Sequence, residues 1–222
     1  MTNTALAIGP APARRRAPYP SHLVQTAQLR DGRPITLRPI KAGDLLLERA
    51  FVVGLSAQTR YQRLLSGRKL MPGELKRLTD IDYERELALV AILDVEGSPQ
   101  ILAVARYVHD DAHEPGSADF AIVVGDAWQG QGLGETLLKA LMRAAPEHGL
   151  SALTGVTLSE NHRMIALARK LGFRTWREHG DATLTDLRWA MQEDDDDRAL
   201  PQAPAETPFL PDEEALWGVR LS

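Results

Sequence analysis

The sequence predicts an α+β fold, in which helices flank a mixed and mostly antiparallel central sheet. Two apolar runs meet at a Glu-Gly-Ser-Pro turn within residues 86–110, which indicates a β-hairpin. A strand, a glycine-rich turn, an amphipathic helix and another strand follow over residues 118–158. Residues 173–191 supply two last strands around a His-Gly-Asp turn. A meander, a β-α-β unit and a terminal hairpin in this order are typical of a sheet with strands of both directions.

The segments before the first hairpin supply two more strands and three helices. Residues 27–40 predict two short strands around Asp31-Gly32, a favoured hairpin turn. Residues 41–56 have apolar residues at helical spacing behind Asp44, which caps the predicted helix. Two short helices are predicted within residues 56–66 and 71–82. After the glycine-rich turn, helices are expected over residues 135–145 and 163–172.

One domain is expected over residues 21–192, between two tails. Residues 1–20 are rich in alanine, proline and arginine, and they are predicted to be disordered. Residues 193–222 form an acidic, proline-containing tail with a net charge of −7, whereas the whole chain carries −4. The remaining body is therefore close to neutral, which argues against nucleic-acid binding because nucleic-acid-binding domains present a strongly basic face.

The composition excludes several kinds of site. The chain has no cysteine, so it has no disulfide, no thiolate nucleophile and no cysteine-bound metal. No two histidines have metal-ligand spacing supported by carboxylates, and no metal site is expected. We expect a cytoplasmic protein with no membrane contact, since no apolar run has the length of a signal peptide or a membrane span.

The glycine-rich turn lies in "VVGDAWQGQGLGETLLKALM", residues 123–142. Glycines ahead of a helix favour an anion site, because the first N–H groups of the helix are unpaired and its dipole is positive there. A dinucleotide-binding fingerprint would need glycine at position 135, where Glu135 stands, and the chain has no GKS or GKT of a P-loop. The pattern that is met in full is QxxGxG, with Gln129, Gly132 and Gly134.

This pattern resembles the coenzyme A pyrophosphate loop of the GNAT superfamily of N-acetyltransferases. A second resemblance lies in "ENHRMIALARKLGF", where Asn161 and the Leu-Gly-Phe at 171–173 match the superfamily in the expected order. Residues 27–191 resemble the acetyltransferase domain of bacterial Pat-type protein lysine acetyltransferases, through "DGRPITLRPIKAGD", "LSAQTRYQRLLS" and "ADFAIVVGDAWQGQGLG". The resemblance implies the GNAT fold and acetyl-CoA as co-substrate.

The resemblance also implies a cofactor site. Backbone N–H groups of the loop and the first helical turn should hold the pyrophosphate, and one N–H of the preceding strand should polarise the thioester carbonyl. Asn161 should contact the pantetheine arm or nearby backbone. The cofactor-binding candidates are Ile122, Val123, Val124, Gln129, Gly130, Gln131, Gly132, Leu133, Gly134, Glu135, Thr136 and Asn161.

Asp119 is the candidate general base. It matches the position where Pat-type relatives usually carry glutamate, and alternation places it on one strand face with Ala121 and Val123. A lysine side chain has a pKa near 10.4 and is protonated at neutral pH, so it must lose a proton to a base before its nitrogen can attack. Ala168 replaces the tyrosine that many relatives use to protonate the departing thiolate, so direct attack with one base is the expected mechanism.

The acceptor stays open at this stage. A protein lysine, on an acyl-CoA synthetase for example, is the first expectation. Acetylation of a small amine is an enzymatic alternative, and a non-catalytic acetyl-CoA-sensing module is an alternative of another class. Glu160, His109 and His113 are weaker candidates for catalysis. The sequence does not indicate an oligomeric state.

Overall fold

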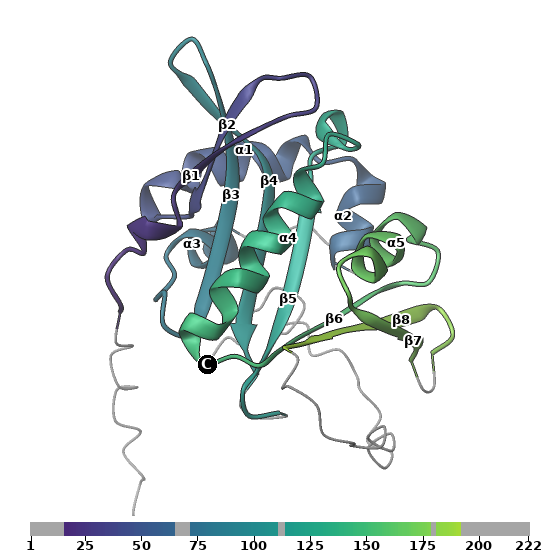
Figure 1. Cartoon of the computed structure of the whole chain (residues 1–222). Coiled ribbons are helices and arrows are strands. Elements are labelled where there is room, and N and C mark those ends of the chain that lie inside the picture. The colour runs from purple at the N-terminus through teal and green to yellow at the C-terminus, as the bar shows by residue number, and fades with distance from the viewer. Residues whose placement is uncertain (1–15, 65–71, 111–113, 179–180, 192–222) are drawn as a thin grey trace, which may run out of the picture.

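The computed structural model of the chain describes residues 16–64, 72–110, 114–178 and 181–191. Eight strands form one sheet in the order β1-β2-β3-β4-β5-β6-β8-β7 (Figure 1). All neighbouring strands are antiparallel except β5 and β6, which run parallel. The α+β class and the mixed sheet predicted from the sequence are thus confirmed.

The elements follow the predicted order. The strands are β1 Gln25–Gln28, β2 Pro34–Pro39, β3 Glu86–Val95, β4 Ser98–His109, β5 Ser117–Val124, β6 Ala152–Leu158, β7 Arg174–Arg177 and β8 Leu184–Ala190. The α-helices are α1 Leu45–Gly54, α2 Ala57–Leu64, α3 Pro72–Thr79, α4 Leu133–Ala144 and α5 His162–Lys170. Short 3-10 helices are η1 Ser21–Leu23, η2 Ala42–Asp44, η3 Asp126–Trp128 and η4 Ala145–His148. None of these described helices is long and apolar enough to cross a membrane.

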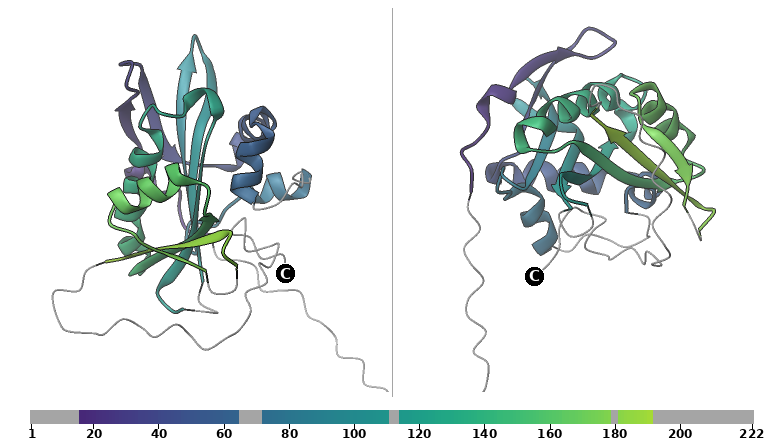
Figure 2. Two further views of the ribbon diagram at one scale, coloured as in Figure 1. Left: turned by 90° about the vertical axis from the view of Figure 1, so that its right-hand side faces the viewer. Right: turned by 60° about the horizontal axis from the view of Figure 1, so that its bottom comes forward.

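The helices cover both faces of the sheet. Figure 2 shows α1 and α2 on one side of the strands and α4 and α5 on the other. Leu137 and Leu141 of α4, four residues apart, are fully buried against one face. Phe51 of α1 and Leu55, which directly follows this helix, pack by the same spacing against the other face, where Val104 of β4 is also buried. The sheet therefore separates two apolar cores, and its α1 face carries the candidate base and the pocket described below.

The packed domain begins earlier than the expected residue 21. The Ala17 N–H donates to the Asp82 carbonyl at 2.8 Å. The Tyr19 hydroxyl donates to the Pro39 carbonyl at 3.1 Å, and its ring meets the Tyr83 ring edge-on with centroids 5.7 Å apart. Residues 16–20 thus belong to the domain, because one aromatic side chain finds a partner that composition does not reveal. Most of both predicted tails lies outside the described residues.

Candidate active site

Strands β5 and β6 are paired over only three residues and then separate (Figure 1). The last pair joins Asp119 to Thr154. Beyond it, β5 continues along β4, whereas β6 continues along β8. Gly155 lies where the strands part, and a Cβ atom there would lie 2.9 Å from Cε1 of Phe120 and 3.0 Å from its carbonyl oxygen. A larger residue would force the strands apart at the point where the opening begins.

The β5 edge of this opening presents the N–H groups of Ile122 and Val124. The Gly125 N–H, directly after β5, donates to the Leu102 carbonyl of β4 at 2.9 Å. Because N–H directions alternate along a strand, the Val123 N–H also points toward β4, and those of Ile122 and Val124 point toward β6. Of the three oxyanion donors considered from the sequence, the register leaves Ile122 and Val124 facing the opening.

The glycine-rich loop joins η3 to α4 and ends in unpaired helical N–H groups. Gly132 has φ of +87°, and α4 begins at the next residue. Thr136 is already engaged, because its N–H and its hydroxyl both lie 3.1 Å from the Gly132 carbonyl oxygen. Gly134 has another role: a Cβ atom there would lie 3.1 Å from Cδ2 of Leu167, so its absence lets α5 approach α4. The backbone N–H groups before Thr136, including that of Leu133, are the ones left for an anion.

The loop side chains contact protein groups. Oε1 of Gln129 accepts a hydrogen bond from Nη1 of Arg163 at 2.9 Å. Glu135 points away from the loop and pairs with Lys139 at 2.8 Å and Lys170 at 2.6 Å. Hydrogen bonds from these two lysines lower the pKa of Glu135 to about 2. Gln131, whose buried Oε1 has no hydrogen-bond partner among the described residues, is the side chain most open to a further donor.

Asp119 lies at the branch point of the two strands and is half-buried. Its Oδ1 atom accepts a hydrogen bond from the Thr154 hydroxyl at 2.8 Å. The side chain shares its strand face with Ala121 and Val123, as alternation predicts. The carboxylate is thus oriented by a neighbouring strand, at the start of the opening and on the α1 face of the sheet.

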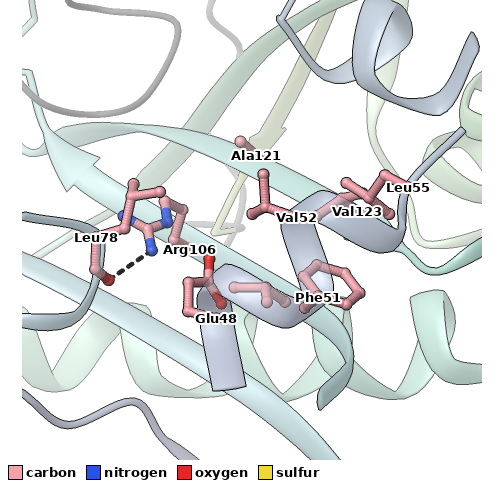
Figure 3. Close-up of a pocket in the computed structure, with 9 residues that line it drawn as sticks. Glu48, Phe51, Val52, Leu55, Leu78, Arg106, Ala121 and Val123 are labelled. Carbon is pink, nitrogen blue, oxygen red and sulfur yellow. Dashed lines mark hydrogen bonds between the residues drawn. The ribbon is translucent and has the colours of Figure 1, made fainter. Parts of the chain in front are cut away.

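A small pocket lies on the same face, between α1 and strands β4 and β5 (Figure 3). Its walls are largely apolar, and they include Ala121 and Val123. Two buried charged residues, Glu48 of α1 and Arg106 of β4, also line it, with 3% and 4% of their surfaces exposed. Arg106 donates to the Leu78 carbonyl at 2.8 Å (Figure 3). Burial lowers the pKa of Arg106, and the negative charge of Glu48 acts in the opposite direction.

Asn161 is the N-cap of α5. Its Oδ1 atom accepts from the Met164 N–H at 3.2 Å, and its Nδ2 atom donates to the Thr157 hydroxyl at 3.2 Å. Both ends of the amide are therefore used to join β6 to α5. The cofactor contact expected of this residue could still use the second Nδ2 proton or the second lone pair of Oδ1.

Two of the weaker candidates lie at strand ends, His109 at the end of β4 and Glu160 two residues after β6. Glu160 is exposed, and the half-buried His109 ring lies 6.3 Å from that of Tyr107. His113 lies outside the described residues. Within the ranges that the structure describes, no group of three histidine, aspartate or glutamate side chains is placed to hold a metal ion.

Three residues at the site were not identified from the sequence. Arg163 lies two positions after Asn161, and this spacing from a recognised motif is the one signal that could have indicated it. Asp126 and Thr154 carry no such signal, because their partners are distant in the chain. Asp126 accepts hydrogen bonds from Ser56 and Thr59, which lie 70 and 67 residues away.

Comparison with known proteins gives a consistent result. The model of the acetyltransferase (GNAT) family matches residues 50–173. An acetyltransferase of Pseudomonas aeruginosa is 32% identical over 164 residues, which cover 73% of this chain and 87% of that protein. The acetyltransferase Pat of Mycolicibacterium smegmatis is 31% identical over 160 residues, which cover 72% of this chain and 47% of that protein.

Solved structures show the same fold. The GNAT domain of S. lividans PAT superposes with a TM-score of 0.71 at 25% identity, covering 78% of this chain and 100% of that domain. RimL, a ribosomal L7/L12 α-N-protein acetyltransferase solved in complex with coenzyme A, superposes with a TM-score of 0.53. RimL is 12% identical and covers 71% of this chain and 94% of its own, so it supports the fold alone.

Proposed function

Because the chain belongs to the acetyltransferase (GNAT) family, whose members use acetyl-CoA, we propose that it acetylates the side-chain amine of a protein lysine, with Asp119 as the general base. The observation that carries this proposal is the position of Asp119. Its carboxylate is fixed by Thr154 at the branch point of β5 and β6, beside the strand edge that presents Ile122 and Val124. A base and two N–H donors thus border one opening.

The co-substrate fits the two features of this opening. The N–H groups before Thr136 suit the pyrophosphate, since a helix N-terminus attracts negative charge. The free edge of β5 suits the pantetheine arm, whose amides pair with a strand edge as a peptide does. The N–H groups of Ile122 and Val124 would then lie beside the thioester carbonyl and stabilise the negative charge that develops on its oxygen.

The acceptor approaches from the α1 face. The ammonium of a lysine first loses a proton to Asp119, because its pKa near 10.4 keeps it charged at neutral pH. The free amine then forms a C–N bond with the carbonyl carbon while the C–S bond breaks and CoA leaves as a thiolate. The nitrogen releases its second proton to water, which leaves the neutral amide. Ala168 is fully buried and supplies no acid, so the thiolate departs unassisted or takes a proton from water. A thiol pKa near 8.5 makes this leaving group acceptable.

The acceptor class rests on the resemblance to Pat-type enzymes, and an acyl-CoA synthetase is the first protein to test. The experiment measures release of free CoA from acetyl-CoA, with the synthetase, lysine peptides and small amines as acceptors. Mass spectrometry of the acceptor locates the acetyl group. Asp119→Asn should reduce kcat at least about 100-fold, and Asp119→Glu should retain activity, since general-base catalysis contributes about 10²- to 10⁴-fold.

Three results would contradict the proposal. Turnover of small amines with no acetyl-lysine on any protein would replace the acceptor class. Full activity of Asp119→Asn would remove the base role. Binding of acetyl-CoA with no release of CoA in the presence of any acceptor would favour a sensing module.

A further inference from the structure

Asp126 lies at the start of the cofactor loop and holds the first turn of α2. One carboxylate oxygen accepts from the Ser56 N–H at 2.9 Å. The other accepts from the Ser56 hydroxyl at 2.7 Å and from the Thr59 hydroxyl at 2.6 Å. Burial alone would raise the pKa of Asp126, but the hydrogen bonds from Ser56 and Thr59 outweigh it and lower the pKa. The carboxylate is therefore charged at neutral pH and makes three charge-assisted hydrogen bonds to one helix end.

The helix that Asp126 holds lies beside the opening. Helix α2 lies against both β5 and β6, the two strands that separate beyond Asp119. Its eight residues are too few to form a stable helix alone, so its position depends on tertiary contacts. It lies on the face of the sheet from which the acceptor approaches the base.

The segment that begins at Asp126 also contacts α5, through Gln129. Gln129, three residues after Asp126, accepts from Arg163, and its Nε2 atom lies 3.5 Å from the Thr59 hydroxyl. Thr59 thus contacts the loop at two points. Any change in the loop between Asp126 and Gln129 acts on the first turn of α2, because both residues face the same threonine.

We propose that Asp126 is a positioning residue that links occupancy of the cofactor loop to α2, so that bound CoA holds this helix in place beside the opening. CoA binds the N–H groups that follow Gln129 and reduces the freedom of the loop. The three hydrogen bonds of Asp126 pass that restraint to α2. Binding of the acceptor beside α2 is favoured in turn, since coupling between two sites is reciprocal. This last consequence rests on the proposed function.

Hydrogen exchange tests the link with CoA alone. Exchange of the α2 amides is followed by mass spectrometry with and without saturating CoA, in wild type, Asp126→Asn and Thr59→Val. CoA should slow exchange in α2 about tenfold in wild type and less than about twofold in both variants, because each variant loses a hydrogen bond to a charged group. Isothermal calorimetry confirms that each protein is saturated.

Asp181→Asn is the matched control. Asp181 also accepts from a backbone N–H and a hydroxyl, both of Thr183, at 2.8 and 2.5 Å, but in the turn before β8. This variant should keep the tenfold effect. Thr59→Val alters α2 and leaves the loop sequence intact, so it decides the matter if Asp126→Asn fails to fold.

Two outcomes overturn the link. One is that CoA slows amide exchange in α2 equally in wild type, Asp126→Asn and Thr59→Val, and the other is that CoA does not slow this exchange in wild type. Failure of the proposed function looks different. A wild-type protein in which CoA protects α2, but which acetylates no lysine, would refute the acceptor class and leave the role of Asp126 intact. With an accepted substrate, Asp126→Asn should raise the KM of the acceptor more than the KM of acetyl-CoA.

Discussion

The Thr154 hydroxyl donates a 2.8 Å hydrogen bond to Asp119 at the last residue pair that joins β5 to β6. The two residues thus fix the base and the branch point of the strands together. Thr154 is held in turn by the pairing of β6 with β8, where it lies opposite Arg188. The orientation of the carboxylate therefore depends on three strands.

Replacing Thr154 tests this orientation. Thr154→Val should lower kcat about 10- to 100-fold, because a misplaced catalytic group loses much of its effect. Thr154→Ser keeps the hydroxyl and should restore most of the activity, and the KM of acetyl-CoA should change little in either variant. Steady-state kinetics would contradict the role of Thr154 if the valine variant were as active as the serine variant.

Arg163 supplies a second prediction. Its guanidinium donates to Gln129 beside the expected phosphate site. Arg163→Ala should therefore raise the KM of acetyl-CoA about tenfold, a change that corresponds to the energy of one charge-assisted hydrogen bond. The value of kcat should stay close to that of wild type. Arg169→Ala is the control on the same helix, since Arg169 instead contacts Thr175 of β7 at 2.8 Å. An equal rise of KM in both variants would indicate a general effect on α5.

Gly132 and Gly149 separate backbone strain from cofactor binding. Both have positive φ, +87° and +72°, and in both an added Cβ atom would meet no other atom within 4 Å. Each Gly→Ala variant should lower the free energy of unfolding by about 1–2 kcal/mol, the cost of a left-handed conformation for alanine. Denaturant titration measures this loss. Only Gly132→Ala should also weaken acetyl-CoA binding, and a similar loss of binding in Gly149→Ala would contradict the loop assignment.

The buried Tyr107 and the half-buried His148 predict a pH dependence of stability. Burial raises the pKa of the Tyr107 phenol, which therefore stays protonated and donates to Nδ1 of His148. Burial lowers the pKa of His148, so the unfolded chain binds a proton more readily than the folded one. Stability should accordingly fall as the pH drops below the ordinary histidine value of about 6.5.

Urea denaturation at pH 7.5 and 5.5 checks this sign. The loss of stability at pH 5.5 should be smaller in His148→Gln than in wild type. A larger loss in His148→Gln would show that the protonated ring is accommodated in the fold.

Local patterns predict the elements of this fold well. The turn between β3 and β4 has φ of 53° at Glu96 and 82° at Gly97, the geometry of a two-residue hairpin turn that Gly97 favours. The apolar stripe of α4 and the alternation along β5 likewise follow from neighbouring residues alone. The class of fold is therefore contained in short segments.

The site depends on pairings between distant segments. Whether Ile122 or Val123 faces the opening is decided by the register of β5 against β4, which no local pattern fixes. Gln129 matches the loop motif in the sequence, but the motif does not predict that its side chain contacts Arg163. That contact forms because α5 packs close to the loop. Local patterns predict the loop and propose Asp119 as a base, but they do not predict Arg163 and Thr154, which contact Gln129 and Asp119 from distant segments.

The separation of β5 and β6 gives the protein a sheet edge in the interior of a continuous sheet. Such an edge offers unpaired N–H groups to any extended chain, and it is a known route to aggregation. A bound pantetheine arm would occupy these groups and act as a missing strand. Binding of CoA or acetyl-CoA would then also stabilise the folded protein, by about 2.7 kcal/mol at a ligand concentration 100 times Kd. CoA in the purification buffer should accordingly increase the yield of monodisperse protein.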